Sequence, residues 1–195
     1  MTSRTTLGVV LAGPNGAGKS TTAPYLLKDA LAVDEFVNAD TIAQGLSAYR
    51  PDAAAVTAAK VMLERLRALA RMRRDFAFET TLSGRSHSRW LRELQASGYR
   101  THLIFLSLPS ADLAVARVAD RVRRGGHHVP DAVVRRRFVL ALRNLFSVYI
   151  PAVDVWNVYD NADVVSPRLI AYRAFGASAV VADAEAWKSL KELQS

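Results

Sequence analysis

The strongest chemical signal in the sequence is the run Gly13-Pro14-Asn15-Gly16-Ala17-Gly18-Lys19-Ser20, which has the complete spacing G-x-x-x-x-G-K-[ST]. Glycines at these positions let successive backbone N–H groups point inward around a phosphate, at the positive end of a following helix. The lysine reaches the β- and γ-phosphates, and the next hydroxyl ligates Mg²⁺. We therefore predict that residues 13–20, together with Thr21, bind ATP, with Lys19 as a catalytic residue and Ser20 as the metal ligand.

The sequence argues against a nucleotide-driven motor. Motor and transporter ATPases usually place an acidic residue directly after a run of four apolar residues, where it helps to hold Mg²⁺. The run Leu103-Ile104-Phe105-Leu106 is followed by Ser107, and no acidic residue is near it. This leaves two classes of protein, a small-molecule kinase and a non-catalytic nucleotide binder.

Two carboxylates are predicted at the ends of strands. Asp40 follows the predicted strand 35–39, and Glu79 follows the predicted strand 76–78. Because the carboxyl ends of parallel strands line the ligand crevice of an open sheet, both side chains should face a substrate. Asp40 either accepts the proton of an attacking hydroxyl or caps the helix that begins at Thr41, and the two roles are compatible.

Polar residues near these carboxylates complete the predicted substrate site. Thr80 and Thr81 offer hydroxyls to a polar substrate or to the metal shell, or they serve the turn. The residues assigned to substrate binding are Asn38, Asp40, Glu79, Thr80, Thr81, Arg85 and His127. Asn161 follows the fifth predicted strand, where it either meets the adenine edge of the nucleotide or forms a plain turn.

A basic segment is predicted to form a lid over about residues 121–137. Seven arginines lie between residues 117 and 137, and Gly125-Gly126 separates two predicted helices. A hinged, positively charged flap can close over ATP, exclude water and neutralise charge on the transferred phosphoryl group. We predict Arg121 and Arg136 as inward-facing catalytic residues, then Arg124, assigned to the nucleotide, and Arg137. The others are expected on a solvated face.

Apolar runs that alternate with amphipathic stretches predict an α/β fold, a P-loop three-layer sandwich with a mainly parallel, five-stranded sheet. The predicted strands are 7–12, 35–39, 76–78, 102–108 and 155–159. Helices are predicted at 18–31, from Pro51, at 87–96, at 110–123 with Ser110 as its cap, and from Pro130. A strand pair that turns at Gly176 and a helix over 183–193 should close the chain.

The helix after Pro51 has two distinct predicted faces. Apolar residues recur at spacings of three and four, which predicts a buried stripe formed by Val56, Ala59, Leu63, Leu66 and Ala70. Charged residues are predicted on another face: Lys60, Glu64, Arg67, Arg71 and Arg74.

The composition is that of a globular chain, and we expect one domain over residues 1–195. The longest run without a charge, residues 5–18, is far shorter than the roughly 20 apolar residues that a membrane span needs. Cysteine is absent, which excludes disulfides and thiol chemistry and favours a cytoplasmic location. The net charge of +8, with 21 arginines and 5 lysines, attracts anions, although codon bias explains it equally well.

Together these residues resemble the zeta-toxin family of P-loop kinases. The matching segments are 13–20, 37–40, 78–84, and Arg121 with 125–130 and Arg136-Arg137, followed by a looser match over 154–161. They occur in the expected order over about residues 7–161. The resemblance implies a sheet whose first strand lies between the third and the fourth, and ATP-dependent phosphorylation of a hydroxyl.

The resemblance also implies an acceptor, a partner and residue roles. The acceptor would be the sugar 3′-hydroxyl of UDP-N-acetylglucosamine, and the partner a small antitoxin. Asp40 would be the base, Glu79 and Thr81 would bind substrate, and Arg121 and Arg136 would be lid arginines. We therefore predict a nucleotide-sugar kinase that uses Mg²⁺ and ATP. The alternative is an ATP-bound interaction or nucleic-acid-binding module with little turnover, although no aromatic–basic interleaving supports nucleic-acid binding.

Overall fold

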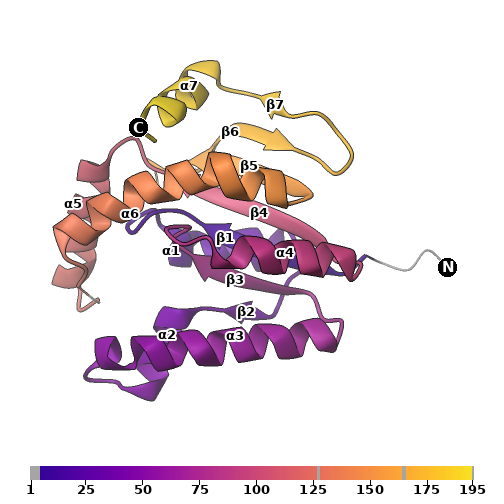
Figure 1. Ribbon diagram of the computed structural model, residues 1–195. Coiled ribbons are helices and arrows are strands. Elements are labelled where there is room, and N and C mark those ends of the chain that lie inside the picture. Colours follow the sequence, from indigo (N-terminus) through magenta and orange to yellow (C-terminus); the bar gives the residue numbers. More distant parts are fainter. Residues whose placement is uncertain (1–4, 127, 164–165, 195) are drawn as a thin grey trace.

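A computed structural model describes residues 5–126, 128–163 and 166–194. Within these ranges, seven strands form one sheet in the order β2-β3-β1-β4-β5-β6-β7 (Figure 1). The strands are β1 Leu7–Ala12, β2 Phe36–Val37, β3 Phe76–Thr80, β4 Arg100–Ser107, β5 Val155–Asp160, β6 Arg168–Arg173 and β7 Val180–Val181. The first five are parallel, and β6 and β7 add to the β5 edge as antiparallel strands. The predicted P-loop α/β architecture, with β1 between β3 and β4, is confirmed.

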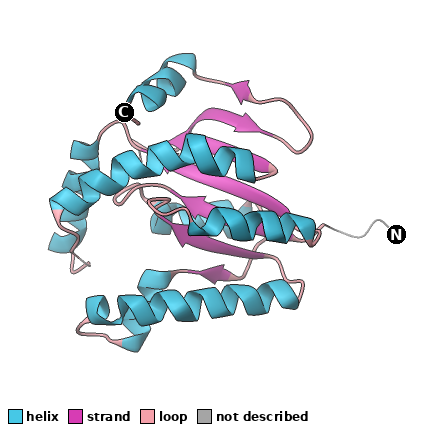
Figure 2. Cartoon of the chain, viewed as in Figure 1, coloured by secondary structure: helices cyan, strands magenta, loops and turns pink. Residues whose placement is uncertain are grey.

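Helices cover both faces of the sheet. In Figures 1 and 2, α4 and α6 cross in front of the sheet, and α1 lies behind it. The helices are α1 Lys19–Ala23, α2 Ala39–Leu46, α3 Ala55–Arg71, α4 Ser86–Ala96, α5 Ala111–Arg123, α6 Asp131–Asn144 and α7 Ala184–Glu192. Irregular turns extend several of them: η1 Pro24–Asp29, η2 Pro51–Ala54, η3 Leu145–Tyr149 and η4 Ile150–Ala152. In the described part of the chain, no helix has both the length and the apolar character needed to cross a bilayer.

The central strands are buried on both faces, which accounts for their aliphatic and aromatic composition. Fully buried side chains of β1 and β3 include Val9, Val10, Leu11, Phe76 and Phe78. The parallel register places Ala12, the last residue of β1, beside Thr80 of β3 and Phe105 of β4. The phosphate loop therefore leaves the sheet at the same edge where β3 ends.

The second strand is shorter than predicted. It contains only Phe36 and Val37, and Asn38 caps α2 by accepting hydrogen bonds from the backbone N–H groups of Asp40 and Thr41 at 2.7 and 3.3 Å. An asparagine side chain satisfies the free donors of the first helical turn well. Asp40 therefore lies in the first turn of α2 and not at a strand end, and the cap is Asn38.

The helix predicted after the phosphate loop is present but irregular. Five residues of α1 are followed by six residues of π-helix in η1. Pro24 has no N–H group, so the carbonyl of Ser20 loses its usual helical donor. The chain then bonds with a wider spacing, from the Ala30 N–H to the Tyr25 carbonyl at 3.1 Å.

The buried stripe of α3 is rotated by one position from the prediction. Its buried residues are Ala58, Met62, Leu66 and Leu69. Val56 is 71% exposed and Leu63 is 38% exposed, so only Leu66 of the predicted stripe is buried in the core. Both stripes satisfy helical periodicity because alanine and leucine are frequent all round this helix. The choice between them depends on what packs against α3.

This assignment predicts different stabilities for two matched substitutions. Leu66→Ala should lower the free energy of unfolding by about 2–5 kcal/mol, because it leaves a cavity in the core. Leu63→Ala, on the same helix, should cost about 1 kcal/mol or less. Urea unfolding measures both, and helix propensity cancels because the change is the same. Equal losses would contradict the rotated stripe.

Candidate active site

The phosphate loop between β1 and α1 has a conformation that requires glycine. Gly13 has φ +149°, and a Cβ atom there would lie 2.3 Å from the carbonyl oxygen of Leu106. At Gly16, a Cβ atom would lie 2.7 Å from the carbonyl oxygen of Ala114. At these two positions the loop is pressed against β4 and α5, without space for a side chain. The N–H groups that begin α1 lack intrahelical acceptors, so they are available to a phosphate.

Lys19 folds back over this loop. Its Nζ atom donates to the carbonyl oxygens of Gly13 and Pro14 at 2.8 and 3.0 Å, and it lies 3.6 Å from Oε1 of Glu79. The residue is only 6% exposed, and burial lowers the pKa of Lys19, while the Glu79 carboxylate opposes that shift. A phosphate beside Nζ would further favour the charged form. The loop therefore presents a cation that is stabilised by an incoming anion.

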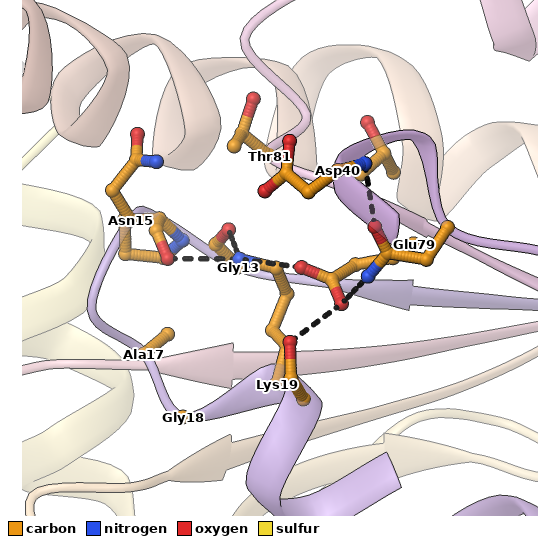
Figure 3. A network of polar contacts seen from close by, with 12 residues as sticks. Gly13, Asn15, Ala17, Gly18, Lys19, Asp40, Glu79 and Thr81 are labelled. Atoms are coloured by element: carbon orange, nitrogen blue, oxygen red, sulfur yellow. Dashed lines mark hydrogen bonds and ion pairs between the residues drawn. The ribbon is translucent and has the colours of Figure 1, made fainter. Parts of the chain in front are cut away.

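Glu79, at the end of β3, joins three separate segments (Figure 3). Its Oε2 atom accepts hydrogen bonds from Nδ2 of Asn38 at 2.7 Å and from Oγ of Ser20 at 3.2 Å, and Oε1 faces Lys19. Asn38 is also the cap of α2. Glu79 therefore fixes the start of α2 relative to the phosphate loop.

Two cavities meet at this network. The larger, of about 580 Å³, is lined by the phosphate loop and by arginines of α5. The smaller, of about 340 Å³, is lined by residues of α2, α3 and α4 and by the end of β3. Asp40, Glu79 and Thr81 line both. Asp40 and Thr81 lie close together in Figure 3, so a carboxylate and a hydroxyl stand at the junction of the two cavities.

Most of the residues that are predicted to bind the nucleotide line the larger cavity. Seven predicted residues of the loop and lid line the larger cavity: Asn15, Gly16, Gly18, Lys19, Ser20, Thr21 and Arg124. Arg121 lines it too. Gly13, Pro14 and Ala17 are buried parts of the loop backbone and do not line the cavity.

The predicted orientation of Arg136 is wrong. Arg136 is exposed and lines neither cavity, whereas Arg137 lines the smaller one and points an Nη1 atom at Oδ1 of Asn15, 3.5 Å away. One residue along a helix is a rotation of about 100°, so only one of two neighbours can face inward. Two others, Arg123 and Arg135, pair with Asp120 and Asp112 on α5. His127 lies outside the described residues.

The end of β5 supports the loop from below. Asn161 is fully buried, and its Nδ2 atom donates to the carbonyl oxygen of Ala17 at 2.6 Å. Arg117 donates to the carbonyl oxygens of Asn161 at 2.8 Å and of Gly16 at 3.4 Å. The predicted contact between Asn161 and adenine is therefore wrong, because a side chain without exposed surface cannot reach a base. The sequence did not predict that Arg117 supports the phosphate loop, although Arg117 lies one helical turn before Arg121 on the same face.

The connection between β3 and α4 is held by α6. Leu82 is fully buried with φ +54°, which is unusual for a bulky residue, and its carbonyl accepts from Nδ2 of Asn144 at 2.7 Å. The Leu82 N–H donates to Oγ1 of Thr80 at 3.2 Å, which confirms the turn role of Thr80. Arg85 is exposed, donates to Oδ1 of Asn144 at 3.0 Å and lines neither cavity, so the structure does not bring it to the other predicted substrate-binding residues. Thr81 faces both cavities.

The oxygen atoms around Ser20 fit a magnesium ion. The Ser20 hydroxyl and the Glu79 carboxylate lie 3.2 Å apart, and Asp40 lines the same cavity. Mg²⁺ prefers hard oxygen ligands and is usually bound by one or two carboxylates together with water and substrate phosphates. Ser20 with Glu79 or Asp40 could therefore hold the ion.

The smaller cavity contains residues that no sequence motif indicated: Ala59, Met62, Leu63, Ser86 and His87. The His87 ring packs on Phe78 with the ring centroids 5.0 Å apart. Burial lowers the pKa of His87 below its ordinary value of 6.5, so the imidazole is neutral at pH 7. Ala59 and Leu63 had the periodicity of core residues, which concealed their place in a cavity wall.

A family model described as an AAA domain matches residues 9–138. The matched segment includes most of β1, the phosphate loop and Glu79, and it covers more than half of the 195 residues. The chain belongs to this AAA domain family. An uncharacterized protein of Haemophilus influenzae is 27% identical over 126 residues, which cover 65% of this chain and 88% of that protein.

Solved structures share the fold of this AAA domain chain. A chain of AvrRxo1-ORF1:-ORF2 with ATP has a TM-score of 0.75 at 16% identity; the match covers 99% of this chain and 65% of that one, so this chain spans about two thirds of its length. A chain from the PezAT chromosomal toxin–antitoxin system of Streptococcus pneumoniae has a TM-score of 0.65 at 16% identity, covering 99% and 80%. A gluconokinase from Sinorhizobium meliloti has a TM-score of 0.53 at 18% identity, covering 82% and 85%. The fold is P-loop kinase-like.

The buried support of the phosphate loop predicts a loss of nucleotide affinity in Asn161→Ala. The Ala17 carbonyl would lose its buried donor, which costs about 1–3 kcal/mol, or roughly a 5- to 150-fold weaker Kd for ATP. Isothermal titration with ATP measures this. Asn157→Ala is the matched control, because Asn157 lies within β5, away from the loop. An unchanged Kd in Asn161→Ala would refute the supporting role.

The pKa of His87 predicts a pH dependence of stability. Because burial lowers that pKa in the folded state, the unfolded chain binds more protons just below pH 6.5, and stability should fall as the pH drops through that range. His87→Gln should lose less stability than the wild type between pH 7 and pH 5. Urea midpoints measured across this range test the prediction, and parallel curves would rule it out.

Proposed function

We propose that this AAA domain chain is an ATP-dependent kinase that phosphorylates a hydroxyl of a small molecule. The observation that carries the proposal is the position of Asp40, with Glu79 and Thr81, on the wall shared by two cavities. A kinase needs its nucleotide and its acceptor to meet at one point, with a base in reach of the acceptor hydroxyl. We assign ATP to the larger cavity and the acceptor to the smaller one. The P-loop kinase-like fold supports this assignment.

In the proposed reaction, the acceptor hydroxyl oxygen bonds to the γ-phosphorus while the bond from that phosphorus to the β-phosphate oxygen breaks and ADP leaves. The hydroxyl proton passes to the carboxylate of Asp40. Lys19 and the loop N–H groups hold the β- and γ-phosphates, and Arg121 and Arg124 offset negative charge on the transferred group. Ser20 and a neighbouring carboxylate would hold Mg²⁺, which would neutralise part of the negative charge of the phosphates.

We further infer that residues 1–195 act as one kinase domain in which about residues 121–137 close over ATP. The chain turns after α5 at Gly125, whose φ of +86° is a left-handed conformation that favours glycine. Arginines on both sides of this hinge line the two cavities. Closure would exclude water from the γ-phosphate and limit its hydrolysis.

The acceptor that we favour is a nucleotide sugar, with UDP-N-acetylglucosamine as the first candidate. The support is the resemblance of residues 37–40, 78–84 and 125–130 to the zeta-toxin family. The likeness in fold to a chain of the PezAT toxin–antitoxin system adds to it, and also supports a small antitoxin as a partner.

The proposed base predicts the effect of Asp40→Asn. Transfer to the acceptor should fall by about 100-fold or more, since the amide cannot take the hydroxyl proton. ATP affinity should stay the same or rise slightly, because a negative charge near the phosphates is removed. Phosphate transfer from ATP to a panel of UDP-sugars, with a parallel titration of ATP, measures both effects.

Asp34→Asn is the matched control, because Asp34 is exposed and lines neither cavity. Normal turnover in Asp40→Asn would exclude Asp40 as the base. Slow loss of ATP that no acceptor accelerates would count against the kinase and favour a nucleotide-binding module.

A further inference from the structure

A groove continues from the acceptor cavity between α3 and α4. The cavity beside Asp40 shares Leu63, Ser86 and His87 with a second cavity of about 340 Å³. That second cavity shares Arg67, Trp90 and Glu93 with a third, of about 390 Å³. The three cavities follow one another along α3 and α4. The first contains Asp40 and Glu79, and the third lies near the last turns of α3 and α4. Figure 1 shows both helices on one side of the sheet. We call this row of cavities the α3–α4 groove.

The wall that α3 contributes includes one continuous row of residues, with Met62, Leu66 and Ala70 beside it. Ala59, Leu63, Arg67 and Arg71 line successive parts of the groove at a constant spacing of four. Residues with this spacing lie one above the other on one helix face. The row is apolar beside the acceptor cavity and cationic further out, and from Ala59 to Arg67 the helix rises about 12 Å.

In the middle of the groove, one guanidinium group comes from each wall. Arg67 lies on α3 and Arg89 on α4, with Trp90 between the walls. Trp90 stacks on Phe76 with the ring centroids 5.7 Å apart, so the groove is backed by the core. Within the described ranges, Arg67 forms no ion pair or hydrogen bond through its side chain.

Helix electrostatics do not explain this pair of arginines. Arg89 lies in the first turn of α4, where a cation is unfavourable, and Arg67 lies before the last turn of α3. Arg89 forms an ion pair with Glu93 at 3.1 Å. Because the Arg89 side chain is 90% exposed, this pair contributes little to the stability of the helix. In contrast, Arg71 is in the last turn of α3, where a cation is favoured, and Arg73 donates to the Ser97 carbonyl. Those two arginines have a structural role and are left out of the site.

We propose that Arg67 and Arg89 bind a phosphate group of the acceptor itself, at a point of the groove beyond the hydroxyl that is phosphorylated. This inference rests on the proposed kinase function and narrows its acceptor to molecules that join a hydroxyl-bearing unit to a phosphate or diphosphate ester. The hydroxyl lies beside Asp40, the linking part lies over Ala59 and Leu63, and the phosphate lies between the two guanidinium groups. Arginine suits this task because its planar fork binds phosphate oxygens in pairs.

The test is the double substitution Arg67→Ala/Arg89→Ala. Its matched control is Arg92→Ala, because Arg92 is exposed on α4 and lines none of these cavities. The acceptors are UDP-N-acetylglucosamine, free N-acetylglucosamine and a 5′-hydroxyl oligonucleotide. The double variant should raise KM for UDP-N-acetylglucosamine by about 10- to 100-fold with little change in kcat. KM for the free sugar should not change.

A second measurement separates this inference from the proposed function. Calorimetric binding of UDP-N-acetylglucosamine is followed with the phosphate loop filled by a non-hydrolysable ATP analogue. Binding that is lost in the double variant, without any transfer in the wild type, supports the phosphate site and counts against the kinase. Transfer with equal KM in both proteins overturns the phosphate site and leaves the kinase standing.

The results with the other two acceptors also support or contradict the phosphate site. Oligonucleotide phosphorylation that depends on the two arginines supports the phosphate site and identifies a polynucleotide as its source. Equal use of free N-acetylglucosamine and UDP-N-acetylglucosamine by the wild type overturns the site, as does a wild type that binds neither phosphate-bearing acceptor.

Discussion

A lysine that is to bind phosphate must stay charged while it is buried, and the rest of the site is arranged around this requirement. Lys19 is 6% exposed, and burial lowers its pKa, while two loop carbonyls and the carboxylate of Glu79 favour the charged form. Without such partners a buried cation would lose its proton. Glu79 is in reach because β3 lies beside β1 with Leu11 opposite Glu79. The position of β3 beside β1 is therefore what gives Lys19 a carboxylate partner.

The same carboxylate also determines where the proposed base lies. Glu79 accepts a hydrogen bond from Asn38, and Asn38 caps the helix that carries Asp40. A change in the position of β3 would thus move both the lysine environment and Asp40. This coupling fixes the two cavities relative to each other, which the proposed transfer would require because it depends on close alignment of the reacting atoms.

The helices α3 and α4 serve the core and the groove at once. On α3, Leu66 belongs to the buried core and also lines the middle of the groove, together with Leu63 and Arg67. The P-loop kinase-like sheet is shared with a gluconokinase and with the AvrRxo1-ORF1:-ORF2 chain. Substrate choice is thus a property of the helix faces and connections that surround a common sheet.

The sequence by itself determined the phosphate loop, the alternation of strands and helices, and local caps such as Ser110, which accepts from the Leu113 N–H at 3.1 Å. These features follow from residues close together in the chain. Only the tertiary structure decided that Arg137 and not Arg136 faces inward, and which stripe of α3 is buried, because one position changes the direction of a helical side chain by about 100°. It also decided the role of Asn161, whose partner Ala17 is 144 residues away and outside the reach of any local pattern.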